Sequence, residues 1–136
     1  MEQEVSLGDF RFRASDKIRY ADTDRQGHVN NAVFSTLLET GRVELLFELA
    51  EPGSSFVIAR LALEFRAEIR WPGTVVIGTR VGSVGRSSIK LEQGLFQDER
   101  CVATAETVIV FVDDVTRKSR ALPPVVLERL GVLAGG

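Results

Sequence analysis

Residues 31–50 read NAVFSTLLETGRVELLFELA, and this stretch decides the fold. Its apolar side chains recur at spacings of three and four, which predicts one long α-helix over residues 31–50. Because Val43 and Phe47 widen the apolar band, we expect this helix to be largely buried. Gly41, near its middle, costs about 1 kcal/mol relative to alanine. It is either a tolerated glycine or the point where the helix comes into close contact with a sheet.

Extended segments flank this helix. Alternating apolar and polar side chains predict five strands, over residues 10–20, 56–66, 74–84, 87–97 and 101–112. Residues 108–112 are apolar at every position, which is typical of a strand inside a sheet. A short helix is predicted over residues 125–130, after two prolines. One long helix against a mostly antiparallel sheet indicates an α+β fold, which we expect to form a single domain over residues 1–136.

The composition narrows the range of functions. The chain has 136 residues, of which 44% are hydrophobic and 26% charged, and its formal net charge is −2. It therefore lacks the strongly basic character of nucleic-acid-binding proteins. Its single cysteine, Cys101, allows no intrachain disulfide, and no apolar run reaches the roughly 18 residues that cross a bilayer. Since the N-terminal segment does not resemble a signal peptide, we expect a cytoplasmic protein that binds neither nucleic acid nor membrane.

The inventory of reactive residues excludes several classes of enzyme. His28 is the only histidine, so one chain cannot build a His-rich metal site. The sequence contains no G-x-S-x-G motif of serine hydrolases, no phosphate-binding P-loop and no dinucleotide-binding G-x-G-x-x-G. We therefore expect neither a metal nor a cofactor.

Residues 20–31, YADTDRQGHVNN, gather reactive polar side chains at the start of the long helix. A calcium loop does not fit, because Gln26 stands where the loop needs Asp or Asn, and Val33 stands where it needs a bidentate Glu. One remaining interpretation is structural: Asp24 and Asn30 cap the helix and accept its free N–H groups. The other is catalytic: the N–H groups polarise a carbonyl, and Asp24 attacks it or activates a water. The residues alone leave both interpretations open.

The run Asp-x-Asp-x-x-Gly-His-Val-Asn-Asn over residues 22–31 resembles thioesterases of the 4-hydroxybenzoyl-CoA type. The likeness extends over nearly the whole chain, from Ile18 through the helix and four strands to the segment 116–123. It implies the hotdog fold, in which a curved antiparallel sheet of about five strands wraps around one long central helix. It also implies an acyl-CoA thioesterase that hydrolyses an acyl-CoA thioester to the free acid and CoA.

Carried over by position, the resemblance assigns roles within the loop. Asp24 matches the catalytic carboxylate, as nucleophile or general base. The backbone N–H of Asn31 matches the oxyanion donor. Gly27 matches a turn glycine, a residue that accepts positive φ. His28 and Asn30 match the subgroup that carries Gly-His-Val-Asn-Asn, and His28 then either orients the loop or a water, or acts as the general base.

Other polar residues are weaker candidates. Asp22 is expected to brace the loop. Glu39 and Arg42 lie three apart on the helix, which predicts an ion pair. Some hotdog thioesterases carry their carboxylate on this helix, which makes Glu39 a reserve candidate. The segment Arg86-Ser87-Ser88 resembles the rim of the family's pocket, where it would meet CoA phosphates, and its alternative is a solvated hairpin end. Further phosphate candidates are Lys90, Arg117 and Lys118.

The resemblance also implies an assembly. Because a hotdog domain covers one face of its sheet with a helix, we expect a homodimer with a continuous sheet. The pantetheine arm of the substrate would lie between the two subunits, and two such dimers would be able to pair into a dimer of dimers. Two other functions compete with hydrolysis. A non-catalytic acyl-CoA-binding or regulatory domain is disfavoured by the complete set of reactive residues from Asp24 to Asn31. A hotdog dehydratase would need a histidine on the central helix, which this helix lacks.

Overall fold

The computed structural model describes residues 4–133, with side chains described up to residue 131. Its α-helices and strands are, in chain order, β1 (Phe12–Lys17), α1 (Asn31–Phe47), β2 (Ser54–Phe65), β3 (Thr74–Val84), β4 (Ser88–Gln97), β5 (Arg100–Asp113) and α2 (Pro124–Leu133), with short 3-10 helices at Leu7–Asp9 and Tyr20–Asp22. All five predicted strands and both predicted helices are therefore present. No helix within residues 4–133 is long and apolar enough to cross a membrane.

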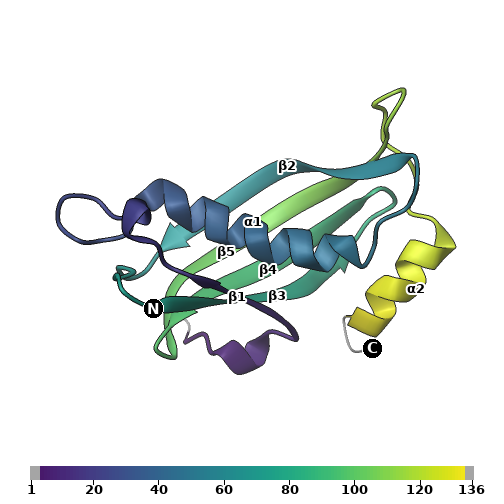
Figure 1. Cartoon of the computed structure of the whole chain (residues 1–136). Coiled ribbons are helices and arrows are strands. Elements are labelled where there is room, and N and C mark those ends of the chain that lie inside the picture. The colour runs from purple at the N-terminus through teal and green to yellow at the C-terminus, as the bar shows by residue number, and fades with distance from the viewer. Residues whose placement is uncertain (1–3, 134–136) are drawn as a thin grey trace.

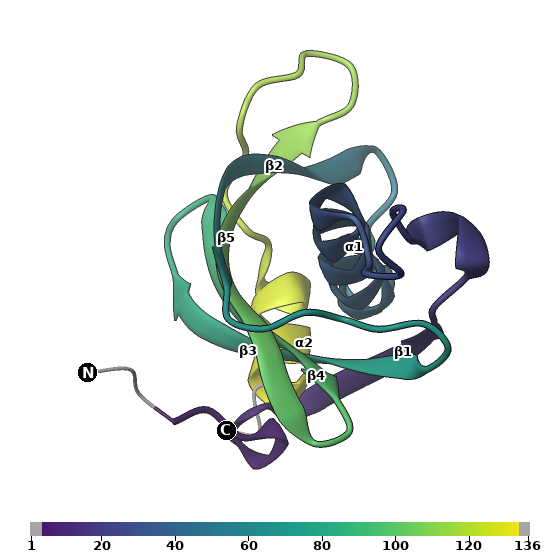
Figure 2. The same ribbon diagram turned by 90° about the vertical axis from the view of Figure 1, so that its left-hand side faces the viewer.

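The five strands form one antiparallel sheet in the order β1-β3-β4-β5-β2. β5 lies between β4 and β2, which confirms that its apolar segment is inside the sheet. β1 and β2 form the two edges. Viewed along α1, the sheet curves around the helix from one edge to the other (Figure 2). This is the arrangement expected of the hotdog fold.

The helix α1 begins at Asn31, as predicted, and ends at Phe47, three residues before the predicted end. Its sheet-facing side is buried and includes Phe34 and Leu38. Val43 and Phe47, by contrast, are 56% and 80% exposed, so the prediction of a largely buried helix was wrong for this side. The reason is that α1 lies on one face of the sheet, and the other described elements leave its outer side open (Figure 1).

Gly41 marks a close approach of α1 to the sheet. A Cβ atom at this position would lie 2.4 Å from Ile77 Cγ2 and 3.0 Å from Gln93 Nε2. The buried Gln93 donates from Nε2 to the Leu38 carbonyl and to Thr79 Oγ1, at 3.0 Å each. The close-contact interpretation of Gly41 is therefore confirmed, and β4 holds the helix at this turn.

The edge strand β2 carries apolar side chains that are incompletely covered. Ile58, Leu61 and Phe65 are 52%, 36% and 50% exposed, although their partners on β5 are buried. Residues opposite each other in a sheet share a face, so these side chains lie on the same side of the sheet as the covered core. An edge strand also presents unpaired backbone N–H and C=O groups. β2 is therefore a surface on which a further strand can pair.

Candidate active site

The loop before α1 is closed by its own backbone. The Asp24 N–H donates to the His28 carbonyl at 2.8 Å, and the Gly27 N–H donates to the Asp24 carbonyl at 3.2 Å. Gly27 has a φ of +80°, so the prediction that it adopts positive φ is confirmed. The turn fixes Asp24 and His28 side by side at the base of the loop.

Asp22 braces this loop, as predicted. Its carboxylate accepts hydrogen bonds from the Arg19 backbone N–H at 2.8 Å and from Arg19 Nη2 at 3.0 Å. The backbone N–H above all, helped by the guanidinium, holds the pKa of Asp22 below its ordinary value, against the opposing effect of burial. The Asp22 carbonyl accepts the Asn30 N–H, and the Ile69 carbonyl accepts the Val29 N–H, both at 2.9 Å. The loop is thereby tied to the helix start and to the segment after β2.

The start of α1 presents a free N–H group. Asn30 is the N-cap: its Oδ1 accepts the Ala32 N–H, and its carbonyl accepts the Val33 N–H, both at 2.9 Å. The capping interpretation is therefore confirmed for Asn30, whereas Asp24 bonds within the loop instead. The Asn31 N–H has no acceptor among the hydrogen bonds of the described residues. A free donor at the positive end of a helix is the geometry that stabilises an oxyanion.

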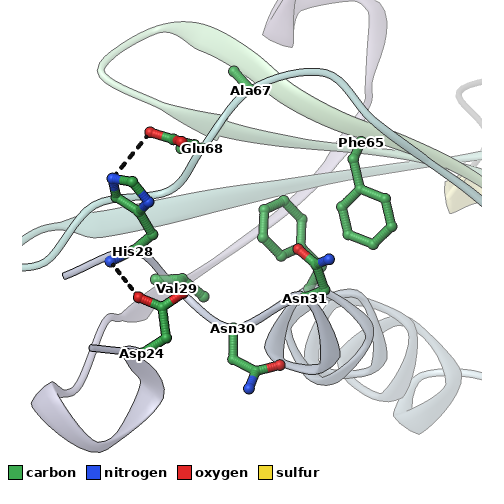
Figure 3. A pocket seen from close by; sticks show the side chains of 9 residues that line it. Asp24, His28, Val29, Asn30, Asn31, Phe65, Ala67 and Glu68 are labelled. Carbon is green, nitrogen blue, oxygen red and sulfur yellow. Dashed lines mark hydrogen bonds and ion pairs between the residues drawn. The ribbon is translucent and has the colours of Figure 1, made fainter. Parts of the chain in front are cut away.

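The carboxylate of Asp24 uses one oxygen for orientation and leaves the other open. Its Oδ1 accepts the backbone N–H groups of Gln26 at 2.8 Å and of His28 at 3.2 Å. Its Oδ2 takes part in no hydrogen bond or ion pair within residues 4–133. Figure 3 shows the carboxylate beside His28, with the bond to the His28 N–H drawn. One oxygen is thus available for attack or proton transfer.

These residues share one open cleft of about 460 Å³, a size that suits a small-molecule site. It is lined by Asp24, His28, Val29, Asn30, Asn31, Phe34, Phe65, Ala67 and Glu68. The structure therefore brings together all four predicted catalytic residues. The rings of Phe34 and Phe65 meet edge to face at 4.9 Å and give the cleft an apolar wall. Residues 4–133 contain no group of three or more His, Cys, Asp or Glu side chains placed to hold a metal ion.

Glu68 is a lining residue that sequence analysis missed. Its Oε2 lies 3.2 Å from His28 Nε2 and 3.5 Å from Arg70 Nη2. It follows β2, forty positions after His28, and no motif marks it. A pairing of the loop with the segment 66–70 brings the two together, since His28 forms a β-bridge with Arg70.

The prediction of an ion pair between Glu39 and Arg42 was wrong. Arg42 is buried, and its Nη1 has no hydrogen-bond partner among the described residues, whereas Glu39 is exposed. No ion pair within residues 4–133 joins them. Burial lowers the pKa of Arg42, an effect that the charge of Glu39 offsets only in part. The spacing of three makes the two residues neighbours on the helix, but the side chain of Arg42 lies in the buried interior and that of Glu39 lies in solvent. Glu39 does not line the cleft.

The predicted phosphate-binding residues lie at the other end of α1. Arg86, Ser87 and Ser88 form the turn into β4, where the Arg86 and Ser87 carbonyls accept N–H groups of Leu122 and Phe111 at 2.8 Å each. Figure 1 places this turn and the loop of Asp24 at opposite ends of the helix. The 17 residues of α1 span about 26 Å. One chain therefore does not bring these residues to Asp24. Arg117 and Lys118 lie in the neighbouring segment after β5, whereas Lys90 pairs with Glu106 at 3.3 Å.

Comparison with known proteins agrees with the resemblance to thioesterases seen in the sequence. The model of the thioesterase-like superfamily matches residues 18–130. The acyl-CoA thioester hydrolase YbgC of Escherichia coli O157:H7 is 29% identical over 120 residues, 82% of this chain and 90% of that protein. The acyl-acyl carrier protein thioesterase ATL2 of Arabidopsis thaliana is 27% identical over 113 residues, 76% of this chain and 60% of that protein.

Solved structures agree. A thioesterase from Thermus thermophilus, complexed with coenzyme A and zinc, superposes with a TM-score of 0.85 at 28% identity, covering 93% of this chain and 96% of the other. The predicted hotdog fold is thereby confirmed, and the predicted class, thioester hydrolase, is that of the matching family. The match over residues 18–130, on a sheet curved around one central helix, shows that this chain belongs to the thioesterase-like superfamily.

Proposed function

We propose that the protein hydrolyses an acyl-CoA thioester to the free acid and CoA, with Asp24 as the catalytic carboxylate and the start of α1 as the oxyanion hole. The relatives and the superposed structure that carry the names thioesterase and acyl-CoA thioester hydrolase support the reaction class. One observation supports the site: the unengaged Asp24 Oδ2 and the unengaged Asn31 N–H belong to residues that line the same cleft.

The chemistry needs no further group. The Asn31 N–H polarises the thioester carbonyl and holds the negative charge that develops on its oxygen. As a general base, Asp24 Oδ2 takes a proton from water while the water oxygen bonds to the carbonyl carbon. The C–S bond then breaks, and the CoA thiolate receives that proton. As a nucleophile, Oδ2 bonds to the carbonyl carbon, the thiolate leaves, and water cleaves the resulting anhydride.

A homodimer would complete the site. The incompletely covered face of β2, with Ile58, Leu61 and Phe65, supports pairing of two β2 edges. A two-fold axis makes such a pair antiparallel, so the Ser54 end of one strand meets the Phe65 end of the other. The Arg86 turn lies near the Ser54 end. Pairing would therefore carry Arg86, Ser87 and Ser88 of a second copy toward the cleft, where they would meet the CoA phosphates.

The oxyanion hole can be tested without disturbing the fold. Asn31 is the first residue of α1, a position that tolerates proline, and Asn30 has the extended backbone (φ −60°, ψ 139°) that precedes proline. Asn31→Pro removes the N–H donor, and kcat for release of free thiol from acyl-CoA substrates should fall about 10²–10³-fold. Asn31→Ala keeps the N–H and should lose far less. Equal rates for the two variants would refute the oxyanion assignment.

Asp24→Asn and Asp24→Ala should each lower kcat about 10²–10⁴-fold, the range of a lost acid–base group. Asp16→Asn, outside the cleft on β1, is the matched control. If the Asp24→Ala variant were as fast as wild type, Asp24 would be excluded as the catalytic carboxylate. If wild type bound acyl-CoA but released no thiol at any acyl chain length, the protein would instead be a non-catalytic binding domain. The cytoplasmic location and the pairing of dimers stay predictions.

A further inference from the structure

The only histidine of the chain contacts a carboxylate at the edge of the cleft. His28 Nε2 lies 3.2 Å from Glu68 Oε2, and both residues line the cleft with Asp24. Figure 3 shows Glu68 on the side of the His28 ring away from Asp24's carboxylate, with the second ring nitrogen turned away from Glu68. Through its backbone N–H and its ring, His28 therefore connects two carboxylates of the cleft.

Glu68 sits on a segment that is held by the loop before α1 and by β4. The Val29 N–H donates to the Ile69 carbonyl at 2.9 Å. The buried side chain of Gln97 accepts the Arg70 N–H at 2.9 Å and donates to the Arg70 carbonyl at 2.8 Å. Arg70 Nη2 also lies 3.5 Å from Glu68 Oε2. Exposed ion pairs add little to stability. The contact of Glu68 with His28 is therefore important for the orientation and protonation of the imidazole rather than for the stability of the fold.

We propose that Glu68 is a positioning residue, which holds His28 with the proton on Nε2 and the lone pair on Nδ1. An ionised carboxylate can only accept a hydrogen bond, so the Glu68 contact requires a proton on Nε2. In a neutral imidazole the other nitrogen is then an acceptor. A carboxylate behind a histidine selects the tautomer in this way at other sites.

The consequence concerns the attacking water, and it rests on the proposed function. Nδ1 accepts a hydrogen bond from one water hydrogen, while Asp24 Oδ2 takes the other as a proton. The water oxygen is then aimed at the thioester carbon, and no proton moves to His28. This arrangement assigns His28 the orienting role and Asp24 the role of general base.

The tautomer can be read directly, because the chain contains one imidazole. The full-length protein, freed of any histidine tag and labelled with ¹⁵N, is studied at pH about 8.5, some two units above the ordinary pKa of an imidazole. Wild type should show a protonated Nε2 and an unprotonated Nδ1. Glu68→Ala should shift the nitrogens toward a mixture of tautomers. Glu68→Gln keeps an acceptor oxygen and should retain most of the wild-type pattern. Glu44→Gln, at an exposed carboxylate of α1 outside the cleft, is the control.

Kinetics with an acyl-CoA substrate supply the second readout. Glu68→Ala should lower kcat about tenfold, as loss of a residue that orients a site histidine does elsewhere. KM should stay within about twofold, and Glu68→Gln should recover most of the loss. An unchanged tautomer, or a changed tautomer with unchanged kcat, would overturn the proposal while leaving the thioesterase function standing. Absence of turnover in wild type would refute both.

Discussion

Gly41→Ala tests how tightly the central helix is held against the sheet. Alanine in place of glycine favours a helix by about 1 kcal/mol. Here the new methyl group would lie 2.4 Å from Ile77 Cγ2 and 3.0 Å from Gln93 Nε2, an overlap that costs about 1–3 kcal/mol. Displacing Gln93 also weakens its bonds to the Leu38 carbonyl and Thr79 Oγ1, worth about 1 kcal/mol each. We expect a net loss of about 2–4 kcal/mol in the free energy of unfolding.

The assay is denaturant unfolding of wild type and variant at one protein concentration, since assembly makes stability concentration-dependent. Gly131→Ala is the matched control. Gly131 lies in α2, where an added Cβ would meet no described atom within 4 Å beyond its chain neighbours and the helix's own backbone, so the same substitution there should stabilise by about 0.4–1 kcal/mol. A double-mutant cycle with Ile77→Ala should show coupling between the two sites. A Gly41→Ala protein as stable as wild type would refute the close contact.

Three further predictions concern the loop, acid stability and assembly. Asn30→Ala removes the N-cap of α1 and should cost about 1 kcal/mol of stability in the same unfolding assay; no loss would mean that the cap bond to Ala32 is not formed. The pKa of Asp22 is lowered in the folded state, so its contribution is present above about pH 4 and is lost as the pH falls below that value. The stability gap between wild type and Asp22→Asn should therefore be constant near neutral pH and shrink in acid, and a gap that widens in acid would contradict the assignment. Lysine at Ile58 and Leu61 should shift the mass in sedimentation toward the monomer, whereas an unchanged dimer would place the interface elsewhere.

Local patterns predicted the elements well because local chemistry determines them. Alternation alone predicted β3 over Thr74–Val84, the bounds that the structure shows. Asn30 and Asn31 marked the helix start, where a capping side chain meets the first free N–H groups. The turn at Gly27 followed from the tolerance of glycine for positive φ. In each case the deciding interactions lie within a few residues.

The remaining features depend on contacts between distant segments. Glu68 enters the cleft because the segment after β2 pairs with the loop of His28, and no spacing along the chain encodes that pairing. The exposure of Phe47 could not be predicted either, since an apolar side chain does not reveal which side of its helix the sheet covers. The predicted ion pair of Arg42 with Glu39 was wrong for the same reason. Helix periodicity gives the neighbours of Arg42 on the helix but not its burial against the sheet.

The self-contained loop of Asp24 has a consequence for how such chains change over generations. The carboxylate oxygen that orients the loop bonds to the backbone of Gln26 and His28, two and four residues away. Asparagine offers the same oxygen without the charge, and a single-base change in an aspartate codon produces it. The loop, the cap at Asn30 and the cleft would all persist. Under the role proposed for Asp24, this one substitution would convert an enzyme of this build into a ligand-binding protein, and the reverse change would restore it, without disturbing the core.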